Sequence, residues 1–251
     1  MDIQHSGRNL TQQLVHNLGA AIAGGRYKSG EGLPSESGLC DEYGISRSAT
    51  REGIKMLTAK GLITSRPRQG IRVQPRSQWN LFDSDVLGWI LHSGPTLEML
   101  REFLQLRMAI EKEAAALAAA DRDRESVEAI DAALKRMKDA EGGFSDPVEA
   151  DIAFHISILN ATNNAFYIQL GSFIETALRV SIRFTNSIKG VKMASYQNHK
   201  TLFDAIARGD IAAAREASTA MQNEALALIE SELTERAQKG TGARAGALGI
   251  E

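Results

Sequence analysis

Two residues with the chemistry of metal ligands, Asp151 and His155, lie four positions apart among apolar residues. On a helix, this spacing places both side chains on one face. A buried carboxylate and imidazole need a polar partner, and a divalent cation such as zinc, nickel or manganese would supply it. His199, at the edge of another apolar helical face, is a third candidate ligand. The pattern also fits a hydrogen-bonded core histidine beside a helix-packing aspartate, so the spacing leaves both interpretations open.

A basic stripe lies nearer the N-terminus. Arg47, Arg51 and Lys55 recur every four residues within a predicted helix over residues 47–60, so they share one helix face. Basic side chains on a helix are what contacts with DNA phosphates and base edges require. Such a stripe also occurs on solvated surface helices, and alone it does not separate the two interpretations.

The segments that flank the stripe favour DNA binding. Gly44 suits the end of a preceding helix and Ser46 suits the N-cap of the next. Two short strands are predicted over residues 62–65 and 71–74, with Gly70 in the turn between them. Helix, turn, helix and basic hairpin are the layout of a winged helix-turn-helix, which places a helix in the major groove of double-stranded DNA.

These residues resemble the DNA-binding domain of GntR-type bacterial transcription regulators. The shared motifs are Leu33-Pro34-Ser35-Glu36, Ser46-Arg47, Arg51-Glu52, Gly61-Leu62 and Gln69-Gly70. The resemblance implies that operator DNA is contacted by Ser35, Ser46, Arg47, Ser48, Thr50, Arg51, Arg66, Arg68, Gln69 and Gly70. Two positions depart from the family. Ser37-Gly38 replaces a usual Arg-Glu, which removes an expected phosphate contact. Gly53 replaces a usual alanine within the predicted helix, a change that lowers the helix propensity by about 1 kcal/mol.

Charge and helical pattern divide the chain. Residues 1–76 carry 11 basic against 6 acidic side chains, and the remainder carries 18 against 25, so only one end suits DNA. After Pro95 the pattern is helical throughout. The fold class expected is therefore mainly α, with an N-terminal winged helix-turn-helix followed by an all-α helical bundle. We expect a winged domain over 8–76, a linker with a short helix over 77–94, a bundle over 95–238 and a disordered tail over 239–251.

Composition and termini indicate a cytoplasmic protein without a membrane partner. Cys40 is the only cysteine, which excludes a disulfide framework and indicates a reducing compartment. No run approaches the roughly 20 apolar residues of a membrane span. Met1-Asp2-Ile3-Gln4 lacks the charged-then-apolar order of a signal peptide.

The predicted bundle resembles the FCD effector domain of the fatty-acid-regulator subgroup of the GntR family. The shared motifs are Asp151-Ile152-Ala153-Phe154-His155, Asn198-His199-Lys200 and Leu106-Arg107-Met108-Ala109-Ile110-Glu111. Members typically bind a metal through one Asp and three His, beneath a carboxylate effector. The resemblance implies Asp151, His155 and His199 as ligands, but Met221 stands at the usual fourth position. A thioether is a poor ligand for a hard divalent cation, so an open coordination position, weak binding and no metal all remain alternatives.

The expected effector is a small carboxylate. Arg107, Arg179 and Arg183 could present guanidinium groups to it, with Asn164 as a further contact, although Arg107 could instead pair with Glu111. The stretch over residues 77–87, with the methionine at the last ligand position and the His199 segment, is similar to the galactonate-operon repressor branch. That resemblance implies a repressor released from operator DNA by a sugar acid such as galactonate or a related hexonate. We expect the repressor to bind DNA as a homodimer.

An enzyme is the competing class. Open coordination positions also characterise catalytic zinc sites, so the alternative is a metal-dependent small-molecule hydrolase fused to a DNA-binding domain. The sequence contains no His-Glu-x-x-His cluster and shows no general base or nucleophile beside the site. We therefore expect a regulator without enzymatic activity.

Overall fold

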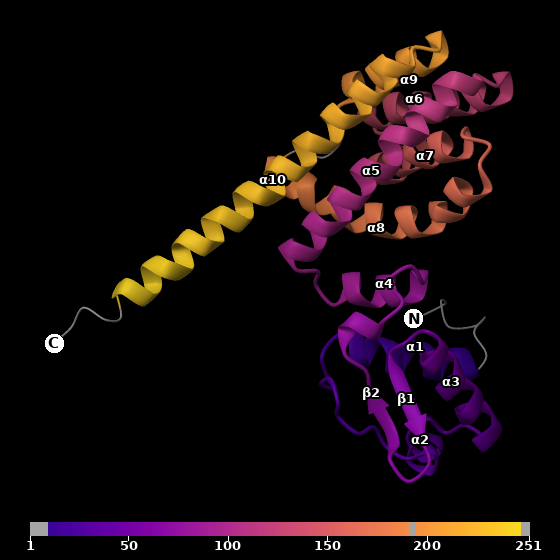
Figure 1. Cartoon of the computed structure of the whole chain (residues 1–251), viewed down its shortest axis with the longest axis vertical. Coiled ribbons are helices and arrows are strands. Elements are labelled where there is room, and N and C mark those ends of the chain that lie inside the picture. Colours follow the sequence, from indigo (N-terminus) through magenta and orange to yellow (C-terminus); the bar gives the residue numbers. More distant parts are fainter. Residues whose placement is uncertain (1–9, 191–193, 247–251) are drawn as a thin grey trace. The chain divides into compact units, whose positions relative to one another are not determined.

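The computed structural model of the 251-residue chain describes residues 10–190 and 194–246. The chain divides into two compact units at the junction of Pro95 and Thr96 (Figure 1). Within the described residues, no helix is both long and apolar enough to cross a membrane.

The N-terminal unit is a winged helix-turn-helix, as the sequence predicts. Its elements are α1 (Leu10–Ala23), α2 (Glu36–Tyr43), α3 (Arg47–Ala59), β1 (Ile63–Arg66) and β2 (Gly70–Val73). The two strands pair antiparallel, with Ile63 opposite Val73 and Arg66 opposite Gly70, and form the wing. Alternate apolar residues of the hairpin, including Ile63, Ile71 and Val73, are buried and hold the wing on the helices.

Local sequence fixes the geometry of the turn between α2 and α3. Gly44 adopts the left-handed conformation with φ 63°, and Ser46 caps α3 by accepting a hydrogen bond from the Ala49 N–H. The helix-turn-helix also explains Gly53, because a Cβ at this position would lie 2.8 Å from Leu14 Cδ2 of α1. Glycine allows α1 and α3 to approach closely, which offsets its low helix propensity.

The segment after the wing, where a linker with a short helix is expected over residues 77–94, contains helical structure. It comprises the short helix η1 (Arg76–Gln78) and α4 (Ser84–His92), and it belongs to the N-terminal unit. Lys60 Nζ, at the end of α3, lies 2.7 Å from an Asp83 carboxylate oxygen and 2.9 Å from Asp85. On α4, the Trp89 indole N–H donates to Nδ1 of His16 at 3.0 Å. These bonds and the burial of Trp89 fasten the segment to the unit.

The C-terminal unit is all-α over its described residues, as the sequence predicts. Its helices are α5 (Leu97–Asp121), α6 (Arg124–Glu141), α7 (Pro147–Asn160), α8 (Ala165–Lys189), α9 (Tyr196–Arg208) and α10 (Ile211–Gly246). Helix α5 packs against α7, α8, α9 and α10, so it forms the centre of the unit. Its polar residues Arg107 and Glu111 are consequently buried.

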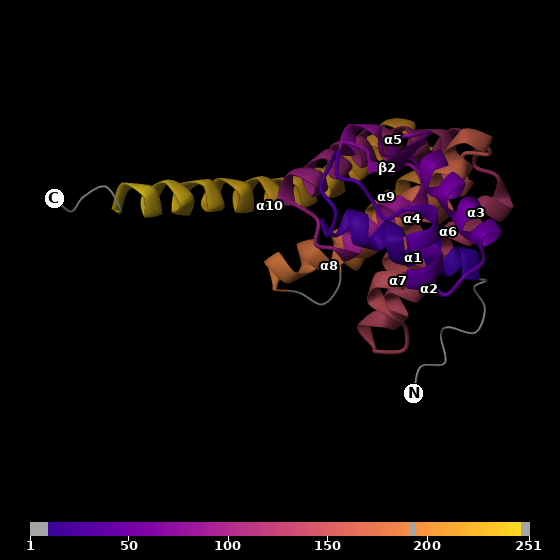
Figure 2. The ribbon, with the colours of Figure 1, turned by 90° about the horizontal axis from the view of Figure 1, so that it is seen from below.

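Helix α10 is longer than the sequence indicates. The structure continues it as helix to Gly246, and its C-terminal part extends past the other helices of this unit (Figure 2). Over residues 239–246 this differs from the expected disordered tail. Nucleation is the costly step of helix formation, so an established helix propagates into a sequence that would not start one. Residues 247–251 lie outside the described residues.

Candidate functional site

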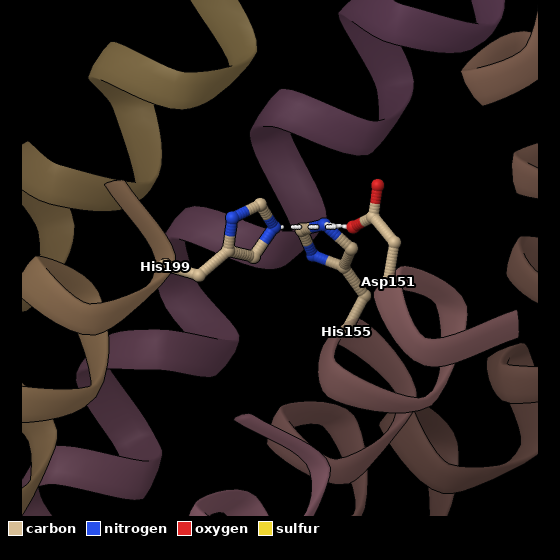
Figure 3. Close-up of side chains that lie close together, drawn as sticks. All are labelled: Asp151, His155 and His199. Carbon is tan, nitrogen blue, oxygen red and sulfur yellow. Dashed lines mark hydrogen bonds and ion pairs between the residues drawn. The ribbon is translucent and has the colours of Figure 1, made fainter. Parts of the chain in front are cut away.

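Three candidate ligands converge at the centre of the helical unit. Asp151 and His155 come from α7, one turn apart, and His199 comes from the first turn of α9 (Figure 3). Asp151 Oδ1 lies 3.2 Å from His155 Nε2 and 3.1 Å from His199 Nε2. One donor atom from each residue lies within 4.8 Å of the others, and all three residues are buried. The fold thus joins residues that are 48 positions apart.

Hydrogen bonds on the far side of each ring determine where the imidazole lone pairs point. His155 Nδ1 lies 2.9 Å from Glu111 Oε2, and His199 Nδ1 lies 2.8 Å from the Ser195 carbonyl oxygen. Carboxylate and carbonyl oxygens accept, so both Nδ1 atoms carry the proton. With Nδ1 protonated, each neutral ring keeps a lone pair on Nε2, beside Asp151 Oδ1. Two imidazole nitrogens and a carboxylate oxygen this close together form a donor set that a cation satisfies.

Arg107 participates in the cluster in two ways. Its Nε donates to Glu111 Oε1 at 2.5 Å, which is the pairing that the sequence offered as an alternative role. Its Nη2 also lies 2.7 Å from His155 Nε2, where it donates to the ring nitrogen. Gln222 of α10, which the sequence analysis did not identify, donates to Glu111 Oε2 at 2.6 Å. Glu111 therefore orients Arg107 and His155 together.

The charges of the cluster shift one another's pKa. Burial raises the pKa of Glu111, but the neighbouring Arg107 and His155 outweigh burial and lower it to about 2. Burial opposes ionisation of Asp151 as well, yet its close contacts with the His155 and His199 rings bring its pKa well below the usual range. Burial and Arg107 lower the pKa of His155, but Glu111 and Asp151 raise it overall. Both carboxylates are thus held as anions.

The cluster forms the floor of a cavity of about 70 Å³ that opens to solvent. Several polar residues that were not expected at the site from the sequence line it, among them Thr185, Asn186, Lys189 and Glu224. The first three lie with Ile182 at helical spacing on one face of α8, a signal the sequence does carry. Met221 also lines the cavity, at the position expected from the sequence.

Three of the four effector residues expected from the sequence lie elsewhere, and only Arg107 lines the cavity. Arg179 pairs with Glu149 and Glu175. Arg183 is exposed because it follows the cavity-facing Ile182 and is rotated by about 100° around α8. Asn164 caps α8, where its Oδ1 accepts from the Phe166 N–H. Among the residues that the structure describes, the cavity lining includes none of these three.

The expected DNA contacts on the helix-turn-helix fall into two groups. Arg47, Ser48 and Arg51 are exposed on α3, and Arg51 Nε pairs with Glu36 at 2.8 Å. Thr50 is fully buried: its hydroxyl donates to the Ser46 carbonyl oxygen, and Cys40 Sγ lies 3.1 Å away. The Thr50 side chain therefore faces α2, away from the exposed arginines of α3.

The remaining expected contacts are exposed. Ser35 and Ser46 are N-caps of α2 and α3, and each hydroxyl also bonds a nearby serine. In the wing, the turn between β1 and β2 has positive φ at Arg68, 65°, and at Gly70, 72°. The exposed turn residues are Arg66, Arg68, Gln69 and Gly70.

Comparison with known proteins agrees with this architecture. Residues 10–73 match the family described as bacterial regulatory proteins of the GntR family, and residues 102–224 match the FCD domain. At 18% identity, the solved structure of Lar, which controls expression of the Listeria monocytogenes agr system, has a TM-score of 0.58 and covers 90% of this chain and 99% of its own. That likeness concerns the fold alone.

Two relatives from Escherichia coli strain K12 are similar over most of their length. The galactonate operon transcriptional repressor is 34% identical over 85% of this chain and 93% of its own. The uncharacterised HTH-type transcriptional regulator YieP is 32% identical over the same shares. With both domain matches in chain order, the protein belongs to the GntR family of transcription regulators and carries an FCD domain.

Proposed function

We propose that this regulator is a repressor that binds operator DNA as a homodimer and is released by a sugar acid such as galactonate or a related hexonate. The observation that carries the proposal is the buried cluster of Asp151, His155, His199 and Arg107 on the floor of a solvent-open cavity. Such a cluster suits an anionic ligand, because it combines a guanidinium with a cation-binding donor set. The similarity to the galactonate operon repressor supports the effector class.

The winged unit would bind the operator. Arg47 and Arg51 project from α3 into solvent, where a helix in the major groove would meet base edges and phosphates. Gly70 lacks a side chain at the turn of the wing, so the backbone can approach a sugar-phosphate strand. The Glu36 pair with Arg51 uses Nε, which leaves the two terminal nitrogens of the guanidinium for DNA.

The three buried ligands fit a divalent metal. Both Nε2 atoms lie within 3.2 Å of the Asp151 carboxylate oxygen, and an imidazole–carboxylate set suits zinc, nickel or manganese. The nearby Met221 is a weak ligand for such ions, so Asp151, His155 and His199 would hold the metal and leave a coordination position open. A bound ion would supply positive charge for an acid effector's carboxylate.

The chain's own residues position the effector. Glu111 and the Ser195 carbonyl hold the two histidine rings in place, as outer-shell partners do in metal sites. Arg107 directs Nη2 into the cluster and would donate to the effector carboxylate. Binding would release operator DNA to the extent that the effector favours one arrangement of the dimer over the other.

A thermal-shift screen tests this function. Galactonate, gluconate and keto-deoxy sugar acids would be added with and without a chelator, and at least one acid is expected to raise the unfolding temperature. Absence of a shift with every acid would contradict the sugar-acid effector. Loss of the shift on chelation would establish that metal takes part.

The same screen addresses the hydrolase alternative, which an open coordination position favours. Each stabilising acid would be recovered after incubation and analysed for chemical change. Intact acid supports a binding site, whereas turnover would favour the metal-dependent hydrolase.

A further inference from the structure

Three polar residues from three helices meet at the mouth of the cavity. Lys189, at the end of α8, places Nζ 2.6 Å from Glu224 Oε1 of α10. Asn198 of α9 donates from its side-chain amide to Glu224 Oε2 at 3.3 Å. All three residues line the cavity that the metal-ligand cluster floors. Glu224 is thus held between two donors inside the site.

Burial separates the mouth from the floor. The Glu224 side chain is 51% exposed, whereas that of Asp151 is 4% exposed. Along α10, Glu224 lies three residues after Met221, about 4.5 Å farther along the helix axis. The whole cavity, from the floor to the mouth, has a volume of about 70 Å³, enough for only several water molecules, so a six-carbon acid bound at the floor reaches the mouth. Its far end therefore meets Lys189, Asn198 and Glu224.

The charges at the mouth are already balanced. Among the described residues that line the cavity, Arg107 pairs with Glu111 and Lys189 pairs with Glu224. A second carboxylate at the mouth would face the Glu224 anion without an unpaired cation to neutralise it. A hydroxyl group both donates and accepts, so it can donate to Glu224 and accept from Asn198 or Lys189.

We infer that Glu224 makes the site selective for polyhydroxy monocarboxylates over dicarboxylates of the same chain length. The inference rests on the proposed function, because it takes the effector carboxylate to bind at Arg107. Repulsion between like charges near a surface is modest but sufficient for discrimination of about tenfold.

Galactonate and galactarate form a matched pair of probes. They share the carbon chain and the hydroxyl groups at carbons 2 to 5, and they differ at carbon 6, a primary alcohol in one and a carboxylate in the other. Isothermal titration of the full chain should give tighter binding of galactonate by about tenfold. In Glu224→Gln this ratio should fall to about two or less, because the amide keeps the size and hydrogen bonding of the side chain without its charge. Glu216→Gln, an exposed change on the same helix, should keep the wild-type ratio.

The outcomes separate the two proposals. Equal or tighter binding of galactarate by the wild type would overturn the role of Glu224 while leaving a sugar-acid effector in place. An unchanged ratio in Glu224→Gln, or a fall of the same size in Glu216→Gln, would overturn it as well. If the wild type binds neither of these acids nor any other sugar acid of the thermal-shift screen, the proposed effector class itself fails.

Discussion

The arginines of α3 and the wing are exposed, whereas the charged residues at the centre of the helical unit are buried and bonded to one another. Arg47 and Arg68 project into solvent. Arg107, Glu111 and Asp151 are at most 6% exposed, and each has a charged or polar partner within 3.2 Å. Exposed arginines keep donors for an outside partner such as DNA, while buried ions must first satisfy one another.

The two units differ in how their charged residues can act, on DNA in the winged unit and on an effector or metal in the helical unit. An exposed ion pair contributes little to stability, so the winged unit can exchange the Arg51–Glu36 pair for DNA at small cost. In the buried cluster, a change at one residue alters the environment of all the others. An effector or metal that enters the cluster can therefore influence several helices at once.

The largest expected effect comes from breaking the buried ion pair. Glu111→Ala leaves Arg107 buried without its carboxylate, and we expect it to cost about 3–5 kcal/mol in the unfolding free energy. Glu113→Ala, on the same helix, removes an exposed pair with Arg215 and should cost less than about 1 kcal/mol. Urea denaturation compares the two variants. A similar cost in both would show that burial does not distinguish the pairs.

Acidification should weaken the same cluster selectively. The folded pKa of Glu111, about 2, lies below the ordinary value of 4.5, so its contribution to stability is present above about pH 4.5 and is lost as the pH falls towards 2. Asp151, whose pKa is also lowered, acts in the same direction. In Glu111→Gln, the loss of unfolding free energy over this range should be smaller by about 3 kcal/mol. Parallel pH profiles for the wild type and this variant would contradict the assignment.

Arg51→Ala tests the exposed side of the comparison. We expect operator affinity to fall by about 10- to 100-fold, because an arginine contact with a base or phosphate is lost. The unfolding midpoint should hardly change, and effector binding should stay intact. Arg26→Ala removes another exposed pair of the same unit, with Glu42, and serves as the control. Fluorescence anisotropy with a duplex selected from a random pool measures the effect, and an unchanged affinity for Arg51→Ala would show that α3 is not the reading helix.

Met221→His should complete the ligand set. A fourth imidazole at the cavity wall should tighten zinc binding by roughly tenfold or more, since even outer-shell partners are worth about 10- to 100-fold. Competition with a zinc indicator measures this. His199→Gln should weaken zinc binding in the same assay. Equal affinities of all three proteins would place the metal elsewhere or exclude it from this site.

The smallest effect concerns packing in the winged unit. Gly53→Ala gains about 1 kcal/mol of helix propensity but places a Cβ 2.8 Å from Leu14 Cδ2, so the net change should stay within about 1 kcal/mol. Gly88→Ala on α4 meets nothing within 4 Å and should stabilise by about 0.5–1 kcal/mol. Thermal unfolding distinguishes them. Equal stabilisation by both changes would mean that α1 and α3 do not require the glycine.

Features with a local signal could be predicted from the sequence. Gly44 and Ser46 mark the turn before α3, and the helical pattern after Pro95 corresponds to the all-α unit. The four-residue spacing of Asp151 and His155 predicted that both share one face, and the structure places the third expected ligand, His199, beside them. Each of these depends on a helix face or a cap, which neighbouring residues determine.

Features that depend on packing between helices could not be predicted. Gln222 reaches Glu111 across 111 positions, and Thr50 is buried because α2 covers it. Arg179 and Arg183 have the right chemistry to bind a carboxylate. However, Arg179 pairs with Glu149, and Arg183 is exposed on a face of α8 that does not line the cavity. Residue type indicates what a side chain can do, and only the packing of helices decides what it faces.

Release of operator DNA by galactonate tests the central claim most directly. The wild type, bound to its selected duplex, should lose about tenfold or more in DNA affinity when galactonate is added. His199→Gln should bind the duplex as tightly as the wild type but should not respond to galactonate. If galactonate leaves the wild-type affinity unchanged, or if His199→Gln is released equally, the buried cluster does not control DNA binding.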